Sequence, residues 1–250
     1  MLAATGVPRR GVAERPAAEE ALLRELLRGP PGDLDALLGR GLPEVGARAA
    51  TKLLGGLARA RRPDLAVAVL QGLQSSRAEV NVFHYNAALN ACSKAGDVAR
   101  ALELLGAMTG ERVEADVITQ NAAISACDKA GDWVRALRIL GGMAAGSIRA
   151  DTISYSSALS ACERAGEWQR GLSLLGEMLQ LRIEMSSLTC TAAIGAWGQA
   201  GRWPEALELV GAMAHRRIEI NTITYNAAIS ACEGEWLVAF RLLDAMRECG

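Results

Sequence analysis

The sequence predicts an all-α protein, an α-solenoid built from helix–turn–helix repeats. Closely similar segments begin at Tyr85, Gln120, Tyr155 and Cys190, so the chain repeats itself every 35 residues. Within each copy the apolar residues recur at the spacing of a helix face and do not alternate as they would in a strand. A pair of short helices cannot bury its apolar face alone, and successive copies must therefore stack to form a continuous core.

The organisation of the chain follows from this period. Residues 1–16 contain Arg9, Arg10 and Arg15, which fits either a flexible terminus or a targeting segment. Residues 17–46 match the repeat poorly, and we expect a helical cap or a degenerate repeat there. The fifth clear copy lacks two residues near Glu233 and Gly234, which should shorten its turn and fray the final pair. The repeat array covers 47–250, divided into a degenerate copy at 47–81, full copies at 82–116, 117–151, 152–186 and 187–221, and a truncated copy at 222–250.

Each copy is predicted to contain two helices separated by a tight turn. In the clearest copy the first helix runs from about Val117 to Lys129 and closes at Gly131, because glycine accepts the positive φ that ends a helix. Asp132 follows and is placed to cap the second helix. Other copies have the same turn at Gly96–Asp97, Gly166–Glu167 and Gly201.

Two columns of equivalent positions predict core packing rather than a reactive site. One column holds cysteine in four copies and Trp197 in another, a replacement that a catalytic or metal-binding role would not survive. The other holds methionine near the end of every second helix, where a flexible apolar side chain fills the core. Free cysteines at this density favour a reducing compartment. The two columns are Cys92, Cys127, Cys162 and Cys232, and Met108, Met143, Met178, Met213 and Met246.

Composition and motifs exclude several classes of function. The 250 residues carry 27 basic and 28 acidic side chains, and residues 82–250 carry 15 basic and 19 acidic ones, which is unlike a strongly basic nucleic-acid binder. No CxxC or HxxxH pair, nucleophile elbow, Walker loop or dinucleotide fingerprint is present, so we expect no catalytic residues, no metal and no cofactor. No apolar run is long enough to span a membrane.

Two further columns admit only small hydrogen-bonding side chains. The first lies early in the first helix, and the second lies just before the next copy begins. Helix capping explains the second column adequately. It explains the first column less well, because an asparagine followed by two alanines inside a helix is not favoured. The first column is Thr51, Asn86, Asn121, Ser156, Thr191 and Asn226, and the second is Asn81, Asp116, Asp151, Ser186 and Asn221.

Together these features resemble the pentatricopeptide repeat (PPR) family, in the form of a P-type array. The likeness rests on the 35-residue unit, on openings such as YNAALNACSKAG from Tyr85 and on closings such as ALELLGAM. It is strong over residues 82–246 and weaker over 47–81. The tetratricopeptide repeat differs, because its period is 34 residues and its early Trp, Leu-Gly and Tyr pattern is missing here. The resemblance implies a right-handed superhelix that binds single-stranded RNA, one base per repeat, along its concave face.

In that family the two polar columns read the base. Amide, hydroxyl and carboxylate groups can distinguish donors from acceptors on an exposed Watson–Crick edge. Family pairings of Asn with Asp favour uracil, and pairings of Thr with Asn or Ser with Ser favour adenine. The expected core site is then 5′-AUUAAY-3′, read in order by Thr51/Asn81, Asn86/Asp116, Asn121/Asp151, Ser156/Ser186, Thr191/Asn221 and the unpaired Asn226.

The resemblance also implies two sets of supporting residues. Apolar side chains near the start of successive first helices sandwich each base, and basic residues near the end of those helices meet phosphates. Gln199 and Glu233 interrupt the basic stripe toward the C-terminus. The apolar set is Phe83, Ile118, Ile153, Leu188 and Ile223, and the basic set is Lys94, Lys129 and Arg164.

Other readings remain open. Solenoids readily present grooves to peptides, so the alternative function is a protein-binding scaffold. A third possibility is a piece of a larger RNA-processing enzyme, whose catalytic domain would follow the array. As partners we expect single-stranded RNA and other RNA-processing proteins, and no membrane. By resemblance the location is a mitochondrion or a chloroplast, and otherwise the cytoplasm.

Overall fold

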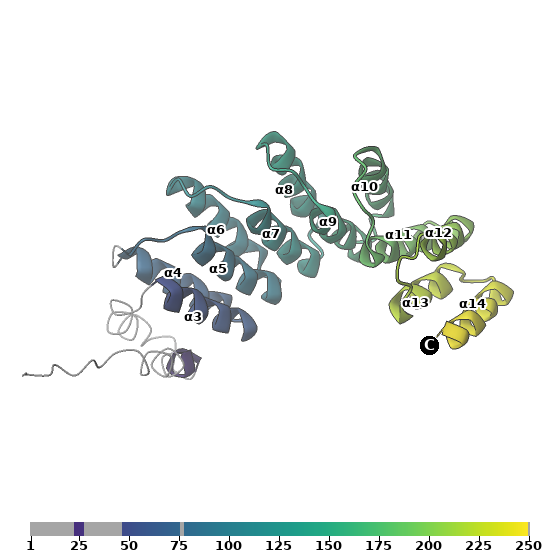
Figure 1. The fold of residues 1–250 in the computed structure, drawn as a ribbon, viewed down its shortest axis with the longest axis horizontal. Coiled ribbons are helices and arrows are strands. Elements are labelled where there is room, and N and C mark those ends of the chain that lie inside the picture. Colours follow the sequence, from purple (N-terminus) through teal and green to yellow (C-terminus); the bar gives the residue numbers. More distant parts are fainter. Residues whose placement is uncertain (1–22, 28–46, 76–77, 250) are drawn as a thin grey trace, which may run out of the picture. The chain divides into compact units, whose positions relative to one another are not determined.

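The computed structural model describes residues 23–27, 47–75 and 78–249 (Figure 1). These residues form helices and turns, and no strand occurs among them. The contacts divide the chain into two compact units, residues 1–91 and 92–250. The predicted terminus at 1–16 lies outside the described residues, and so does most of the predicted cap at 17–46, of which 23–27 are helical.

The first unit contains the degenerate copy as a helical hairpin. Helix α3 (Ala47–Arg59) packs against α4 (Pro63–Ser75) through buried leucines such as Leu54 and Leu70. Arg61 lies in the turn with φ 54°, at the place where the clear copies have glycine. An L-residue with a Cβ adopts this left-handed conformation at a cost, so the copy keeps its turn despite losing its glycine.

The second unit is a stack of helix pairs, and α5 (Val82–Ala95) spans the boundary at residue 91. Each first helix contacts the next first helix, in the order α7, α9, α11, α13, and each second helix packs on the first helices beside it (Figure 1). This is the α-solenoid that the period predicts. The helices are α6 (Val98–Gly110), α7 (Val117–Ala130), α8 (Trp133–Ala145), α9 (Thr152–Arg164), α10 (Trp168–Gln180), α11 (Ser187–Gln199), α12 (Trp203–His215), α13 (Thr222–Ala231) and α14 (Trp236–Cys249).

The turns inside the pairs follow the expected chemistry with one exception. Gly131 has φ 69°, and its N–H bonds to carbonyls of the last turn of α7. Asp97 and Asp132 cap α6 and α8 by accepting from the backbone N–H three residues on. Glu167 makes no such bond at the start of α10, because its longer side chain fits the capping geometry less well. Helix α13 ends early, at Ala231, so the two-residue deletion shortens the first helix of this copy and not its turn, which runs over residues 232–235.

The cysteine and methionine columns lie in the core. Cys92, Cys127 and Cys162 are fully buried and free, and burial raises the pKa of their thiols to about 12, 11 and 11. Neutral, buried thiols are apolar packing groups rather than nucleophiles. Met143 and Met178 are equally buried. The prediction of core packing is therefore confirmed for the four cysteines and for Met108, Met143, Met178 and Met213, whereas Met246 in α14 is only half-buried.

Candidate nucleic-acid interface

The second polar column forms the N-caps of the first helices. Asp116, Asp151, Ser186 and Asn221 each have extended backbone and accept a hydrogen bond from the backbone N–H three residues on. These contacts hold each cap side chain at the start of a helix, next to the first helix of the preceding copy. Capping uses one oxygen of each side chain, and the remaining polar atoms decide what the cap can offer to a ligand.

Asn121 and Asp151 lie side by side and are hydrogen-bonded to each other. The Asn121 Nδ2 donates to Oδ1 of Asp151 at 3.1 Å, and the Ser154 hydroxyl donates to Oδ1 of Asn121 at 2.6 Å. The backbone N–H of Ser154 donates to the same Oδ1 of Asp151 at 2.9 Å. Asn121 is 9% exposed. The pair therefore keeps one N–H of the amide and Oδ2 of the carboxylate for a ligand, a donor beside an acceptor.

Asp151 is held in its charged form. Burial disfavours the carboxylate, but the backbone N–H of Ser154 and the side-chain amide of Asn121 donate to it and outweigh that effect, so the pKa of Asp151 lies below its usual range. The side chain therefore remains an acceptor at neutral pH. A hydrogen bond donated to this anion is stronger than one donated to a neutral acceptor.

Ser156 and Ser186 are joined through a third hydroxyl. Ser156 Oγ donates to the carbonyl of Thr152 at 2.5 Å, so its contact with Thr189 Oγ1 at 2.6 Å requires Thr189 to be the donor. Ser186 then donates to Thr189 Oγ1 at 2.9 Å while it accepts from the Thr189 backbone. Ser156 is only 3% exposed. Of this pair, Ser186 is the better placed to meet a ligand.

Thr191 and Asn221 are linked in the same way. Thr191 Oγ1 donates to the Ser187 carbonyl at 2.8 Å and lies 2.8 Å from Thr224 Oγ1. Asn221 Oδ1 accepts from the backbone N–H of Thr224, while the single proton of the Thr224 hydroxyl is within reach of both Asn221 Oδ1 and Thr191 Oγ1. The amide Nδ2 of Asn221 makes none of these bonds, and Asn221 is exposed. The pair therefore offers amide donors next to a hydroxyl oxygen.

A column of buried side chains connects the two polar columns, and sequence reasoning missed it. Ser154, Thr189 and Thr224 are fully buried, and each bonds both to its own cap and to the polar residue of the preceding copy. Thr119 holds the same place beside Asp116. In the first unit His84 fills this position, where its Nδ1 accepts from the Asn81 backbone. The signal in the sequence was a hydroxyl residue three positions after each cap.

The remaining members of the polar columns lie on the same helices. Thr51 and Asn86 are half-buried in α3 and α5, and Asn226 is exposed in α13. Asn81 is exposed and accepts from the backbone N–H of Phe83 at 3.1 Å.

The apolar column stands out from its surroundings. Its members occupy the second position of each first helix and are between 59% and 68% exposed, although large apolar side chains are otherwise mostly buried. In the second unit each of them is two residues beyond a cap and three before a member of the first polar column. Exposed apolar groups at regular steps provide faces on which flat rings can stack. The members are Phe83, Ile118, Ile153, Leu188 and Ile223.

The basic column differs from the expectation at Arg164. Its guanidinium Nε donates to Oδ1 of Asp128 at 3.0 Å, which joins the ends of α9 and α7. Lys129 is exposed, and Lys94 is half-buried. Arg164 can therefore meet a phosphate only in competition with Asp128.

Protein-family models match most of this array. Residues 49–127 match a model described as a pentatricopeptide repeat-containing protein, residues 153–183 match the PPR repeat, and residues 173–235 match the pentatricopeptide repeat domain. No curated protein matches the chain. Among the described residues no helix is long and apolar enough to cross a membrane, and no cluster of His, Cys, Asp and Glu is suited to a metal ion.

Solved structures give the same answer. The chain is similar to the pentatricopeptide repeat protein PPR10 from maize, with 25% identity and a TM-score of 0.67 over 97% of this chain and 36% of that one. PPR10 in complex with an 18-nucleotide psaJ RNA element gives 25% identity and a TM-score of 0.64, over 95% and 36%. The PPR domain of Arabidopsis thaliana protein-only RNase P 1, in complex with tRNA, shares the fold at 14% identity, with a TM-score of 0.62 over 73% and 96%.

The stacked helix pairs and the 35-residue period thus define an α-solenoid repeat protein. The chain belongs to the pentatricopeptide repeat family. It spans about 36% of the length of PPR10.

Proposed function

We propose that this chain binds single-stranded RNA, one base per repeat, with the core site 5′-AUUAAY-3′. The observation that carries the proposal is the bonded pair Asn121 and Asp151, flanked by the exposed side chains of Ile118 and Ile153. A base held between these aliphatic faces would present its Watson–Crick edge to the pair. PPR10 has been solved with RNA, which supports the same use of the fold here.

The atoms left over after capping support the base assignments. Asn121 and Asp151 offer a donor beside an acceptor, which complements the O4 and N3–H of uracil. Thr191 and Asn221 offer a hydroxyl oxygen beside amide donors, which complements the N6 amino group and N1 of adenine. Only unpaired bases expose these edges, so the ligand is single-stranded. We further propose a role in RNA processing or stabilisation within a mitochondrion or a chloroplast, where PPR proteins typically work.

Exchanging the residue pair proposed to read uracil with the pair proposed to read adenine tests the base assignment. Asn121→Thr with Asp151→Asn should move the preference at the third base from U to A, because donor and acceptor change places, with a discrimination of ~1–3 kcal/mol as for other good polar base contacts. Thr191→Asn with Asn221→Asp should move the fifth base from A to U and serves as the reciprocal control. The measurement is fluorescence polarisation with oligomers that differ at one base.

Two outcomes would contradict the proposal. Equal binding to AUUAAY and to a scrambled oligomer would refute the base assignment. Unchanged preferences in both double variants, with RNA still bound, would show that other residues read the bases.

A further inference from the structure

The fourth position of each first helix is a buried tyrosine in three copies. Tyr85 is fully buried, and its hydroxyl accepts from Gln74 at 3.0 Å. Tyr155 and Tyr225 are 6% and 8% exposed. The copy at 187–221 has Cys190 here, a much smaller side chain that is also fully buried. The repeat therefore lacks the volume of a phenol ring at this point.

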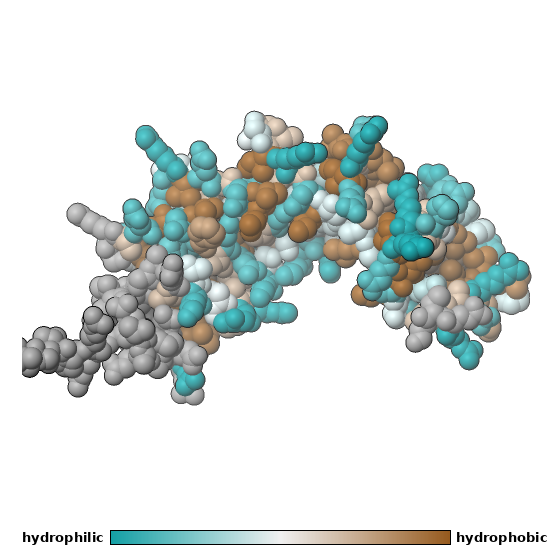
Figure 2. All heavy atoms as spheres, viewed as in Figure 1, coloured by the Kyte–Doolittle hydropathy of each residue, from teal (hydrophilic) through white to brown (hydrophobic). Residues whose placement is uncertain are grey.

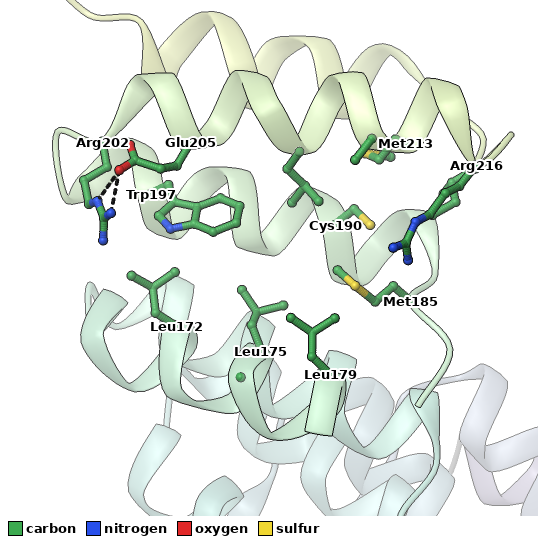
Figure 3. Close-up of a pocket in the computed structure, with 14 residues that line it drawn as sticks. Leu172, Leu175, Leu179, Met185, Cys190, Trp197, Arg202, Glu205, Met213 and Arg216 are labelled. Atoms are coloured by element: carbon green, nitrogen blue, oxygen red, sulfur yellow. Dashed lines mark hydrogen bonds and ion pairs between the residues drawn. The ribbon is translucent and has the colours of Figure 1, made fainter. Parts of the chain in front are cut away.

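A cavity occupies the corresponding space. It measures about 400 Å³ and opens between α10 and α12, above α11. Figure 3 shows Leu172, Leu175 and Leu179 of α10 pointing across it toward Cys190 and Trp197 of α11. One copy earlier, where Tyr155 is present, the cavity is about 260 Å³ and its lining includes Arg170, Ser173 and Glu177. The groove beside Cys190 is thus larger and more apolar than the cavity one copy earlier, and its volume lies in the range of ligand sites.

The rim of the groove is apolar on one side and charged at the two ends. Leu179, which lines the groove, is 59% exposed, and Figure 2 shows hydrophobic side chains at the surface over α10. Arg202 is paired with Glu205 at one end. Arg216, at the other end, takes part in none of the ion pairs of the described residues (Figure 3). An occupant should therefore combine large apolar side chains with a carboxylate.

Helix α14 has this combination. Trp236, Leu237, Phe240 and Leu243 form one exposed stripe at the spacing i, i+1, i+4, i+7, with Phe240 62% exposed. The matching residues of α12, among them Trp203 and Leu207, are partly buried within the stack. Glu235 and Asp244 border the stripe. A helix with apolar anchors at this spacing is the form that docks into a hydrophobic groove.

We propose that α14 of a second copy of this chain docks into the groove between α10 and α12. Phe240 of one copy enters the space that Cys190 leaves open in the other, and Asp244 approaches Arg216. The groove and α14 are different surfaces of the same chain, so the contact is heterologous. The proposal uses none of the polar columns and does not depend on RNA binding.

Sedimentation velocity of the full chain over a wide range of protein concentration tests the proposal. The wild type should self-associate. Cys190→Tyr fills the groove, and Phe240→Glu makes the docking helix polar, so each variant alone should associate at least tenfold more weakly. Val134→Glu, which changes an exposed apolar residue of α8, is the matched control and should associate like the wild type.

Mixing the two variants distinguishes this contact from others. The Phe240→Glu chain keeps an intact groove, and the Cys190→Tyr chain keeps an intact α14, so an equal mixture should form heterodimers. Circular dichroism melts establish that both variants are folded. The proposal is overturned if the wild type stays monomeric, if folded Cys190→Tyr associates normally, or if the mixture of folded variants stays monomeric.

Discussion

Three side chains in contact determine what a copy can offer to a base. Asn121 is fixed by Asp151 on its amide side and by Ser154 on its carbonyl side, so its orientation is set before any ligand arrives. Such preorganisation lowers the entropy lost on binding. The same contact holds the first polar column of one copy against the cap of the next, so the proposed base recognition would use the same atoms as the stacking of the copies.

Removal of the connecting hydroxyl tests this arrangement. Ser154→Ala leaves Oδ1 of Asn121 without its buried donor, which should lower the free energy of unfolding by ~1–3 kcal/mol. Because Asn121 is then less firmly held, the preference for U at the third base should fall severalfold while the other bases are read as before. Urea denaturation and single-base competition measure the two effects.

Two variants control for side effects of this change. Ser154→Thr keeps a hydroxyl, as Thr189 does in the next copy, and should retain both stability and preference. Ser160→Ala removes a hydroxyl elsewhere on α9 and should change neither quantity appreciably. A Ser154→Ala protein with the wild-type preference would show that the hydroxyl only supports packing.

At this scale the sequence predicted the positions but not all the partners. The two polar columns are visible because their side chains recur at a fixed period. The role of Ser154 was not visible, because a hydroxyl three residues after a cap already has an ordinary explanation as part of a capping box. The pairing of Arg164 with Asp128 joins residues of two copies, and no local spacing indicates which cation will be neutralised.

Neighbouring first helices in the stack approach each other closely, and small residues make this contact possible. A Cβ on Gly198 of α11 would lie 2.8 Å from the Cα of Ala231 in α13, so the two helices touch through backbone atoms. A Cβ added to Gly211 of α12 would have no neighbouring atom within 4 Å. The two glycines therefore have opposite roles although both lie in helices.

Substitution of these two glycines by alanine should change the free energy of unfolding in opposite directions. Gly198→Ala forces α11 and α13 apart and should destabilise the protein by ~1–3 kcal/mol, the usual cost of overpacking. Gly211→Ala gains helix propensity without a clash and should stabilise it by up to ~1 kcal/mol. Thermal and urea unfolding measure both, and a stabilised Gly198→Ala variant would be inconsistent with the close contact.

Helices and turns were well predicted because each copy contains its own signals. The first helix of the clearest copy was expected from Val117 to about Lys129 and runs to Ala130. The cavity beside Cys190 was not predicted, since a cysteine in place of a tyrosine indicates a void only when the neighbouring helices are seen not to close on it.

At the scale of the whole molecule, the net charge determines how strongly RNA affinity should depend on salt. Residues 82–250 have four more acidic than basic side chains, and one cation of the basic column is paired with Asp128. Affinity for RNA should therefore depend mainly on base contacts, with a shallow dependence on salt.

Asp128→Asn should release Arg164 for phosphate contact. RNA affinity should increase, and the slope of log K against log salt should steepen by about 0.7, the value for one added phosphate contact to a single strand. Glu103→Gln, an exposed change on α6 with the same charge difference, is the control and should leave the slope nearly unchanged. A titration at several salt concentrations measures both slopes. Identical slopes for the two variants would argue that Arg164 has no phosphate within reach.

The location of Asp151 has a consequence for how such an array could grow. Asp151 caps α9, yet its carboxylate is bonded to Asn121 on α7, so this proposed reading pair joins one copy to the next. A tandem duplication of residues 117–151 would repeat an existing pair unchanged. A duplication of the same length from turn to turn, residues 131–165, would instead create the new combination of Ser156 with Asp151. The boundaries of the duplicated segment would thus decide whether the array gains a second copy of an existing pair or a new combination of residues.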